Sequence, residues 1–96
     1  MSPKNRKKLE KIRKKLDRLD NKFLRLIKIR TDLVNKVTKL KEFKSEIVDT
    51  KRIKKILFNI RRKSLKKKID STVTNKIWKN MILTYIKYEK KNFKKK

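Results

Sequence analysis

The stretch IRKKLDRLDNKFLRLIKIR, residues 12–30, decides the fold of this chain. Its apolar residues recur at intervals of three and four, which is the repeat of an α-helix with one apolar stripe. The repeat continues on both sides of this stretch, and the stripe consists of Leu9, Ile12, Leu16, Leu19, Phe23, Leu26, Leu33, Val37 and Leu40. The pattern predicts one long helix from about Pro3 to Leu40, roughly 50 Å long at a rise of about 1.5 Å per residue.

Arg30 interrupts this stripe at a position where the spacing calls for an apolar residue, between Leu26 and Leu33. The short remainder of one chain cannot cover a stripe of this length, and a sustained seam of this kind is typical of helices that pair. The sequence therefore predicts that the chain associates with a second copy.

Two shorter helices are expected in the second half of the chain. The periodicity lapses from Glu42 to Val48, and Asp49 is a suitable N-cap for a helix that carries Ile53, Ile56, Leu57 and Ile60. The basic half of that helix, 61–68, is expected to fray into a loop. Asp70 or Ser71 then caps a third helix, with an inward stripe of Val73, Ile77, Trp78, Met81, Ile82 and Tyr85. The tail from Lys90 to Lys96 is expected to be disordered or weakly helical.

Composition excludes several classes of protein. Ninety-six residues with 35% apolar content make one small domain. The chain has no cysteine and no histidine, so disulfides, thiolate metal sites and the usual general base at neutral pH are excluded. We expect no metal and no cofactor. No apolar run approaches the roughly 20 residues of a membrane span, and no secretory signal is visible. A cytoplasmic location is expected.

The net charge of +26 has three interpretations. Lysine-rich composition without functional meaning is the simplest, since glycine and alanine are both absent. Nucleic-acid binding through phosphate neutralisation is the second. Attraction of a small anionic substrate is the third. Charge alone does not decide among them.

The first helix resembles the opening helix of the all-helical chorismate mutases, in their short, monofunctional bacterial form. That family opens with an arginine, here Arg13, followed by an aliphatic-Asp pair, a second Asp, and a leucine-rich stretch that ends in arginine, here Arg30. Lys41 follows Arg30 at the family's spacing, and Asp49-Thr50-Lys51-Arg52 is similar to the Asp-x-x-Arg that begins the family's second helix. The resemblance covers about residues 9–91, with a basic extension at 1–8 and a basic tail at 92–96.

The resemblance implies an all-α fold of three helices per chain, intertwined in a homodimer with sites shared between the chains. It implies rearrangement of chorismate to prephenate in phenylalanine and tyrosine biosynthesis. The residues implied to bind substrate are Arg13, donated by the partner chain, with Arg30, Lys41, Asp49, Arg52, Tyr85 and Glu89. Lys41 and Glu89 are the implied catalytic residues.

Two positions depart from the family. Ile53 stands where a glutamate usually binds the ring hydroxyl of the substrate, and Tyr85 stands where many members have a small serine. These departures point to weaker substrate binding, a reshaped pocket, or a site that has lost its function.

Helix geometry supports a ligand shared by Arg30 and Lys41. Eleven residues separate them, which is a net rotation of roughly 20° and a rise of roughly 16 Å. A cation on an apolar face is costly unless an anion meets it. The alternatives are an internal salt bridge, for example from Asp20 or Asp49, and snorkelling of the side chain to solvent.

The reaction suits a chain without histidine or cysteine, because the rearrangement is concerted and intramolecular. Arginines can hold the two carboxylates of the reactive conformer, and Lys41 can stabilise the charge that develops on the ether oxygen. A glutamate at position 89 would have to carry a proton to donate to that oxygen. The alternative for Glu89 is a solvated acid at a helix end that pairs with nearby lysines.

Two other functions compete with this interpretation. A basic, RNA-associated helical protein without catalytic activity would account for the charge, although no RNA-binding motif with stacking aromatics is present. A coiled-coil assembly factor without a pocket would account for the stripe.

Overall fold

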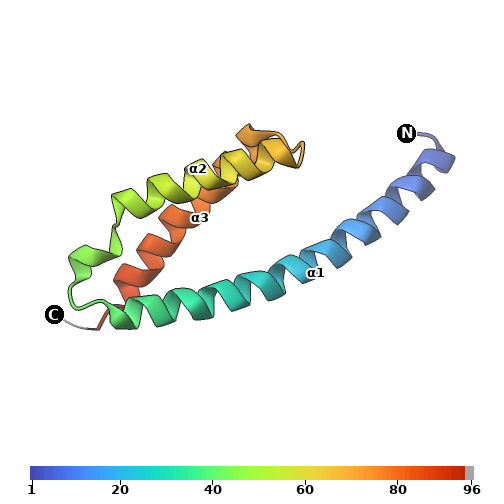
Figure 1. Ribbon diagram of the computed structural model, residues 1–96. Helices are drawn as coiled ribbons and strands as arrows, with labels where there is room; N and C mark the ends of the chain where they lie inside the picture. The colour runs from blue at the N-terminus through green and yellow to red at the C-terminus, as the bar shows by residue number, and fades with distance from the viewer. Residues whose placement is uncertain (95–96) are drawn as a thin grey trace. The chain divides into compact units, whose positions relative to one another are not determined.

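The computed structural model describes residues 1–94. Along this range the chain forms α1 (Pro3–Leu40), a short 3-10 helix η1 (Lys44–Ile47), α2 (Thr50–Lys66) and α3 (Ser71–Asn92), with no strand (Figure 1). The predicted all-α class, with one long and two shorter helices, is confirmed. The chain divides into two compact units, Met1–Lys36 and Val37–Lys96. No helix in the described range is long and apolar enough to cross a membrane.

The first unit consists of nearly all of α1, which begins where local chemistry favours a start. The hydroxyl of Ser2 accepts a hydrogen bond from the Asn5 N–H at 3.2 Å, and Pro3 takes the first helical position. No residue of α1 is buried. Its apolar stripe is about half exposed in the single chain, at Ile12, Leu16, Leu19, Phe23, Leu26 and Leu33.

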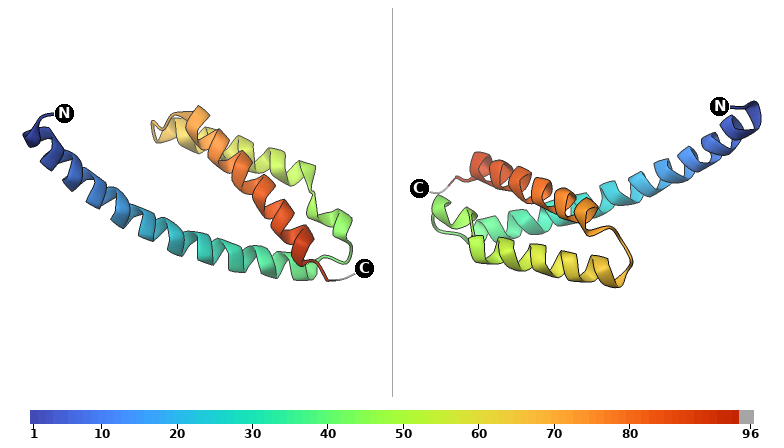
Figure 2. Two further views of the ribbon diagram at one scale, coloured as in Figure 1. Left: turned by 180° about the vertical axis from the view of Figure 1, so that it is seen from behind. Right: turned by 90° about the horizontal axis from the view of Figure 1, so that it is seen from above.

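The second unit contains the end of α1, then η1, α2 and α3. Helices α2 and α3 run antiparallel and side by side, joined by a short turn (Figures 1 and 2), and η1 packs against α3. Ile47 and Ile82 are the only apolar side chains of residues 1–94 that are buried. The small core of this unit therefore lies where η1 and α2 meet α3.

Helix α2 begins as predicted but ends later than predicted. The Asp49 carboxylate accepts a hydrogen bond from the Arg52 N–H at 3.0 Å, which confirms the N-cap. The expectation of a frayed segment at 61–68 is wrong, since the helix continues to Lys66. The reason is Ser64, which is buried and whose hydroxyl lies 2.8 Å from that of Thr74 on α3. This hydroxyl bridge holds the end of α2 against its neighbour.

The turn after α2 is a Schellman motif built without glycine. The N–H of Ile69 donates to the Ser64 carbonyl at 2.9 Å, and the N–H of Lys68 donates to the Leu65 carbonyl at 3.2 Å. Lys68 has φ of 57°, in the left-handed region where glycine is the usual residue. A lysine therefore occupies a backbone conformation that a side chain disfavours.

Helix α3 is capped by Asp70, as predicted. Its carboxylate accepts from both the N–H and the hydroxyl of Thr72, at 2.9 and 2.6 Å. The hydrogen bond from the Thr72 side chain is the main reason that the pKa of Asp70 lies below its usual value.

The predicted inward stripe of α3 is only partly buried in the structure. Ile82 is buried, and Trp78, Met81 and Tyr85 are half-buried. Val73 and Ile77 are more than half exposed, so their expected place in the core is wrong for the single chain. The expectation for the tail is wrong at residues 90–92, which continue α3, and Lys95 and Lys96 lie outside the described residues.

Candidate functional site

Glu89 is a buried acid near the end of α3, with only 8% of its surface exposed. Its Oε1 accepts a hydrogen bond from the Thr38 hydroxyl at 2.8 Å. The alternative of a solvated acid at a helix end that pairs with lysines is therefore wrong as to solvation, while a lysine is indeed a partner of this residue. A buried carboxyl group needs partners of this kind, because unpaired burial is costly.

Lys41 is the charged partner of Glu89. Its Nζ lies 3.9 Å from the same oxygen, Oε1, and the two side chains are 19% and 10% exposed. Lys41 follows the last residue of α1, and Glu89 lies 48 positions later on α3, so the pair joins two distant parts of the chain. The structure thus brings together the two residues that were predicted to be catalytic.

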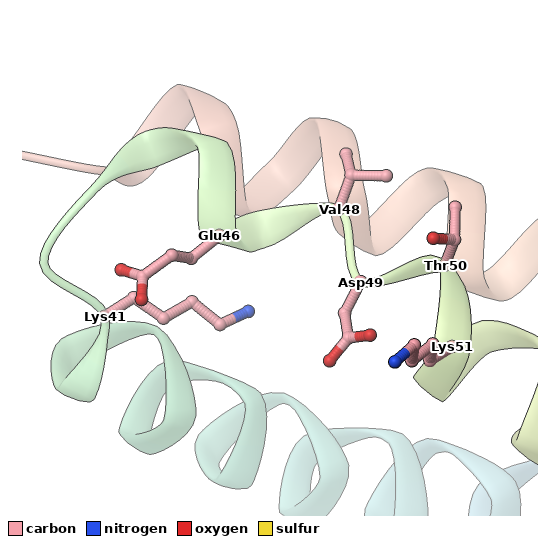
Figure 3. Close-up of a pocket in the computed structure, with 6 residues that line it drawn as sticks. All are labelled: Lys41, Glu46, Val48, Asp49, Thr50 and Lys51. Carbon is pink, nitrogen blue, oxygen red and sulfur yellow. The ribbon is translucent and has the colours of Figure 1, made fainter.

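An open hollow of about 470 Å³ lies beside Lys41, at the N-terminus of α2, and Glu89 is not among its lining residues. Its lining residues are Lys41, Glu46, Val48, Asp49, Thr50 and Lys51 (Figure 3). The side chains of Lys41 and Asp49 point into the same space, whereas Val48 and Thr50 point away from it. Two predicted site residues, Lys41 and Asp49, therefore line one hollow.

The two acids of the hollow are engaged with the backbone. Glu46 accepts from the N–H groups of Glu42 and Phe43 at 2.7 and 2.8 Å, which closes the turn before η1. Asp49 caps α2. The lining thus carries two ammonium groups, Lys41 and Lys51, and two carboxylates whose negative charge these hydrogen bonds do not remove. The N-terminal end of α2 adds a partial positive charge to the same region.

Arg52, Ile53 and Tyr85 do not line this hollow. Arg52 is exposed on α2, and Ile53 is half-buried one position later. The ring of Tyr85 is half-buried and meets the ring of Tyr88 edge-on, with centroids 6.2 Å apart and planes at 85°. A tyrosine at this position thus takes part in aromatic packing on α3.

Arg13 and Arg30 belong to the first unit. Arg13 is exposed and Arg30 is half-buried. Seventeen residues separate them, which at about 100° per residue places them about 100° apart around α1. They do not share one face of the helix, and their assignment to the site rests on the sequence motif.

Sequence reasoning missed Thr38, Glu46 and Lys51. Thr38 lies in the last turn of α1 and Lys41 just beyond it, so no helical spacing relates the two, and the contact of Thr38 with Glu89 gave no signal in the sequence. Glu46 and Lys51 offered no signal either, because a 3-10 turn and the entry to α2 place them. Within residues 1–94 no three potential metal ligands come together.

These features define an all-helical protein in which a buried glutamate pairs with a half-buried lysine, and the lysine lines a hollow at the N-terminus of α2. Residues 12–90 match the family model of chorismate mutase type II, and the chain belongs to this family. No curated protein and no solved structure gives a significant match.

The family gives the activity, and the chain is an isomerase that converts chorismate to prephenate. The predictions of family, fold class and reaction are confirmed. Nothing in the match supports the alternative of a nucleic-acid-binding protein without catalytic activity. The chorismate dianion agrees with the third interpretation of the charge, attraction of a small anionic substrate.

Proposed function

We propose that Lys41 and Glu89 form the catalytic pair of the chorismate mutase site. The observation that carries this proposal is the pair itself, a half-buried lysine and a buried glutamate, of which the lysine also lines the hollow at the N-terminus of α2. A buried pair is a poor device for stability alone, because desolvation offsets much of its attraction. Because Lys41 also lines the hollow, its ammonium group is available to a ligand bound there.

The chemistry assigned to Lys41 is stabilisation of developing charge. In the rearrangement the ether C–O bond breaks while a C–C bond forms, and negative charge grows on the ether oxygen. An ammonium group held in a partly buried site stabilises that charge more strongly than water does, since it needs no reorganisation at the moment of reaction. This interaction is stronger in the transition state than in the ground state, as catalysis requires.

Glu89 is assigned the second contact to the ether oxygen. A carboxylate only accepts hydrogen bonds, so this role requires Glu89 to take up a proton from solvent when substrate binds, which gives it one O–H as donor. In the absence of substrate it pairs with Lys41.

The substrate carboxylates are assigned to arginines. Bidentate pairing with Arg30, and with Arg13 of a second copy, would hold the compact reactive conformer. Asp49, Arg52 and Tyr85 complete the proposed ligand set. Asp49 has direct support as a lining residue of the hollow, while the others rest on the family resemblance.

A homodimer is part of the proposal. It is supported by the apolar stripe of α1, which is about half exposed over more than five turns in the single chain. A contiguous apolar surface of this kind on a helix is typical of an interface, and an isologous pairing would let one chain donate Arg13 to the other. We further propose that prephenate production serves phenylalanine and tyrosine biosynthesis, in the cytoplasm.

The proposal is tested by following chorismate disappearance with the wild type and Lys41→Met. Methionine keeps the length of the side chain and removes its charge, so we expect kcat to fall by about 100-fold, the scale of losing one charge-stabilising donor. Lys36→Met is the matched control, an exposed lysine of the same helix whose loss alters the net charge equally. Wild-type kcat in Lys41→Met would refute the assignment.

A further inference from the structure

The hydroxyl of Thr38 is the nearest donor to Glu89 that the structure gives. It donates to Oε1 at 2.8 Å, whereas the Lys41 ammonium lies 3.9 Å from the same oxygen. The first distance is that of a good O–H···O hydrogen bond, and the second is beyond hydrogen-bond range. Of these two contacts, the one that fixes the carboxyl group in place is the one from Thr38.

The location of the three residues strengthens this point. Thr38 lies in the last turn of α1 and Lys41 directly follows that helix, and both contact the same oxygen of Glu89, a buried residue of α3. A hydrogen bond in a site with little exposed surface is well shielded from water and holds its geometry.

We propose that Thr38 is a positioning residue, which holds Oε1 of Glu89 as an acceptor and thereby directs Oε2 to carry the catalytic proton. The inference rests on the proposed roles of Lys41 and Glu89. In a protonated carboxyl group the carbonyl oxygen is the better acceptor, so a hydroxyl that donates to Oε1 favours the proton on Oε2. Thr38 has no contact with the substrate in this scheme.

The same hydrogen bond also governs the Lys41–Glu89 separation. Without it, the carboxylate can rotate toward Lys41 and form a shorter, hydrogen-bonded ion pair. Substrate would then have to break that pair before Lys41 could reach the ether oxygen. Loss of the Thr38 hydroxyl therefore affects the chemical step more than the capture of the substrate carboxylates.

The experiment compares kcat and KM of the wild type, Thr38→Val and Thr38→Ser. Valine keeps the shape of threonine without the hydroxyl, and we expect kcat to fall about tenfold, the scale of one hydrogen bond to a charged group, with KM changed less than about twofold. Serine keeps the hydroxyl, and we expect it to retain kcat within about threefold of the wild type. A contribution through packing alone would not follow the hydroxyl in this way.

Thr31→Val is the matched control. Thr31 lies on the same helix and donates its hydroxyl to the Ile27 carbonyl at 2.8 Å, so the substitution makes the same chemical change at another position. We expect wild-type kcat. Circular dichroism establishes that each variant is helical, and Thr38→Ala replaces Thr38→Val if the latter fails to fold, because alanine favours a helix.

A double-mutant cycle with Glu89→Ala shows whether Thr38 acts through Glu89. We expect Glu89→Ala to be slow and Thr38→Val to cause no further loss in that background. If Thr38→Val keeps the wild-type kcat while Glu89→Ala is slow, the inference about Thr38 is overturned and the proposed catalytic pair is retained. Wild-type kcat in Glu89→Ala would instead overturn the proposed pair, and with it the role of Thr38.

Discussion

Lys41 Nζ and Glu89 Oε1 lie 3.9 Å apart in the second unit, with side chains that are 19% and 10% exposed. The chain has nine acidic residues against 35 basic ones, so most acids have many exposed cations near them in sequence. Glu89 is the only acidic residue within positions 1–94 that is buried. Its burial, together with a hydroxyl and an ammonium group aimed at one oxygen, distinguishes a built site from incidental surface pairing.

Replacement of Glu89 by glutamine tests the need for a proton at this position. A glutamine amide carries donor hydrogens at every pH, and its oxygen can still accept from Thr38. We expect Glu89→Gln to raise kcat at neutral pH by about tenfold over the wild type, the scale of one general-acid contribution, while Glu89→Ala lowers it. Steady-state kinetics checks both. Equal loss of activity in the two variants would contradict the role of Glu89 as a donor.

Glycine at position 68 should stabilise the protein. Lys68 has φ of 57°, and a left-handed conformation costs a residue with a side chain about 1 kcal/mol. We expect Lys68→Gly to raise the free energy of unfolding by about that amount in a urea titration. Lys67→Gly is the control, since Lys67 has φ of −88° and gains nothing from glycine there. A stabilised Lys67→Gly or an unchanged Lys68→Gly would contradict this account of the turn.

Acid should weaken the cap of α3. The hydrogen bond from the Thr72 side chain lowers the pKa of Asp70 from the ordinary 3.8, so the folded state favours the ionised cap. This contribution is fully present above the unfolded value and is lost as pH falls through the lower, folded value. We expect the Tm difference between the wild type and Asp70→Ala to shrink below about pH 4. A difference that stays constant at lower pH would argue against the cap as its source.

A charge in the apolar stripe of α1 should prevent self-association. Phe23 is 54% exposed in the single chain, and burying an aspartate there against a second copy would leave a charge without a partner. We expect Phe23→Asp to weaken the dimer at least about 100-fold in sedimentation experiments and to abolish activity. Leu24→Asp is the matched control, because Leu24 is 64% exposed but lies about 100° around the helix, off the stripe. A dimeric Phe23→Asp would place the interface elsewhere.

Hydrophobic periodicity and capping residues were sufficient to predict the three α-helices and where each begins. The interval of three and four predicted α1 with both ends in place, and Asp49 and Asp70 marked the starts of α2 and α3 because their side chains bond to specific backbone N–H groups. The end of α2 was not predictable in the same way. Ser64 stabilises it through a hydroxyl on another helix, and that contact depends on tertiary packing rather than on local propensity.

The site was predictable to the extent that a motif fixes residue types. Lys41, Asp49 and Glu89 were named from their resemblance to the family's positions, and their roles remain predictions, while their partners in the fold could not be named in this way. Glu46 enters the hollow through a 3-10 turn that sequence patterns do not reveal, and Thr38 contributes through a single hydroxyl at 2.8 Å. Individual polar contacts of this kind depend on the three-dimensional path of the backbone. Amino-acid composition and hydrophobic periodicity do not determine that path in detail.

The open stripe of α1 has a consequence for how the protein would behave in a living cell. On the proposed homodimer, each active centre needs a side chain from two polypeptides, so dilute chains would be inert. Well below the dissociation constant, flux through the reaction would then rise with roughly the square of the number of chains made. In that range a doubling of expression would raise the output of such a catalyst about fourfold.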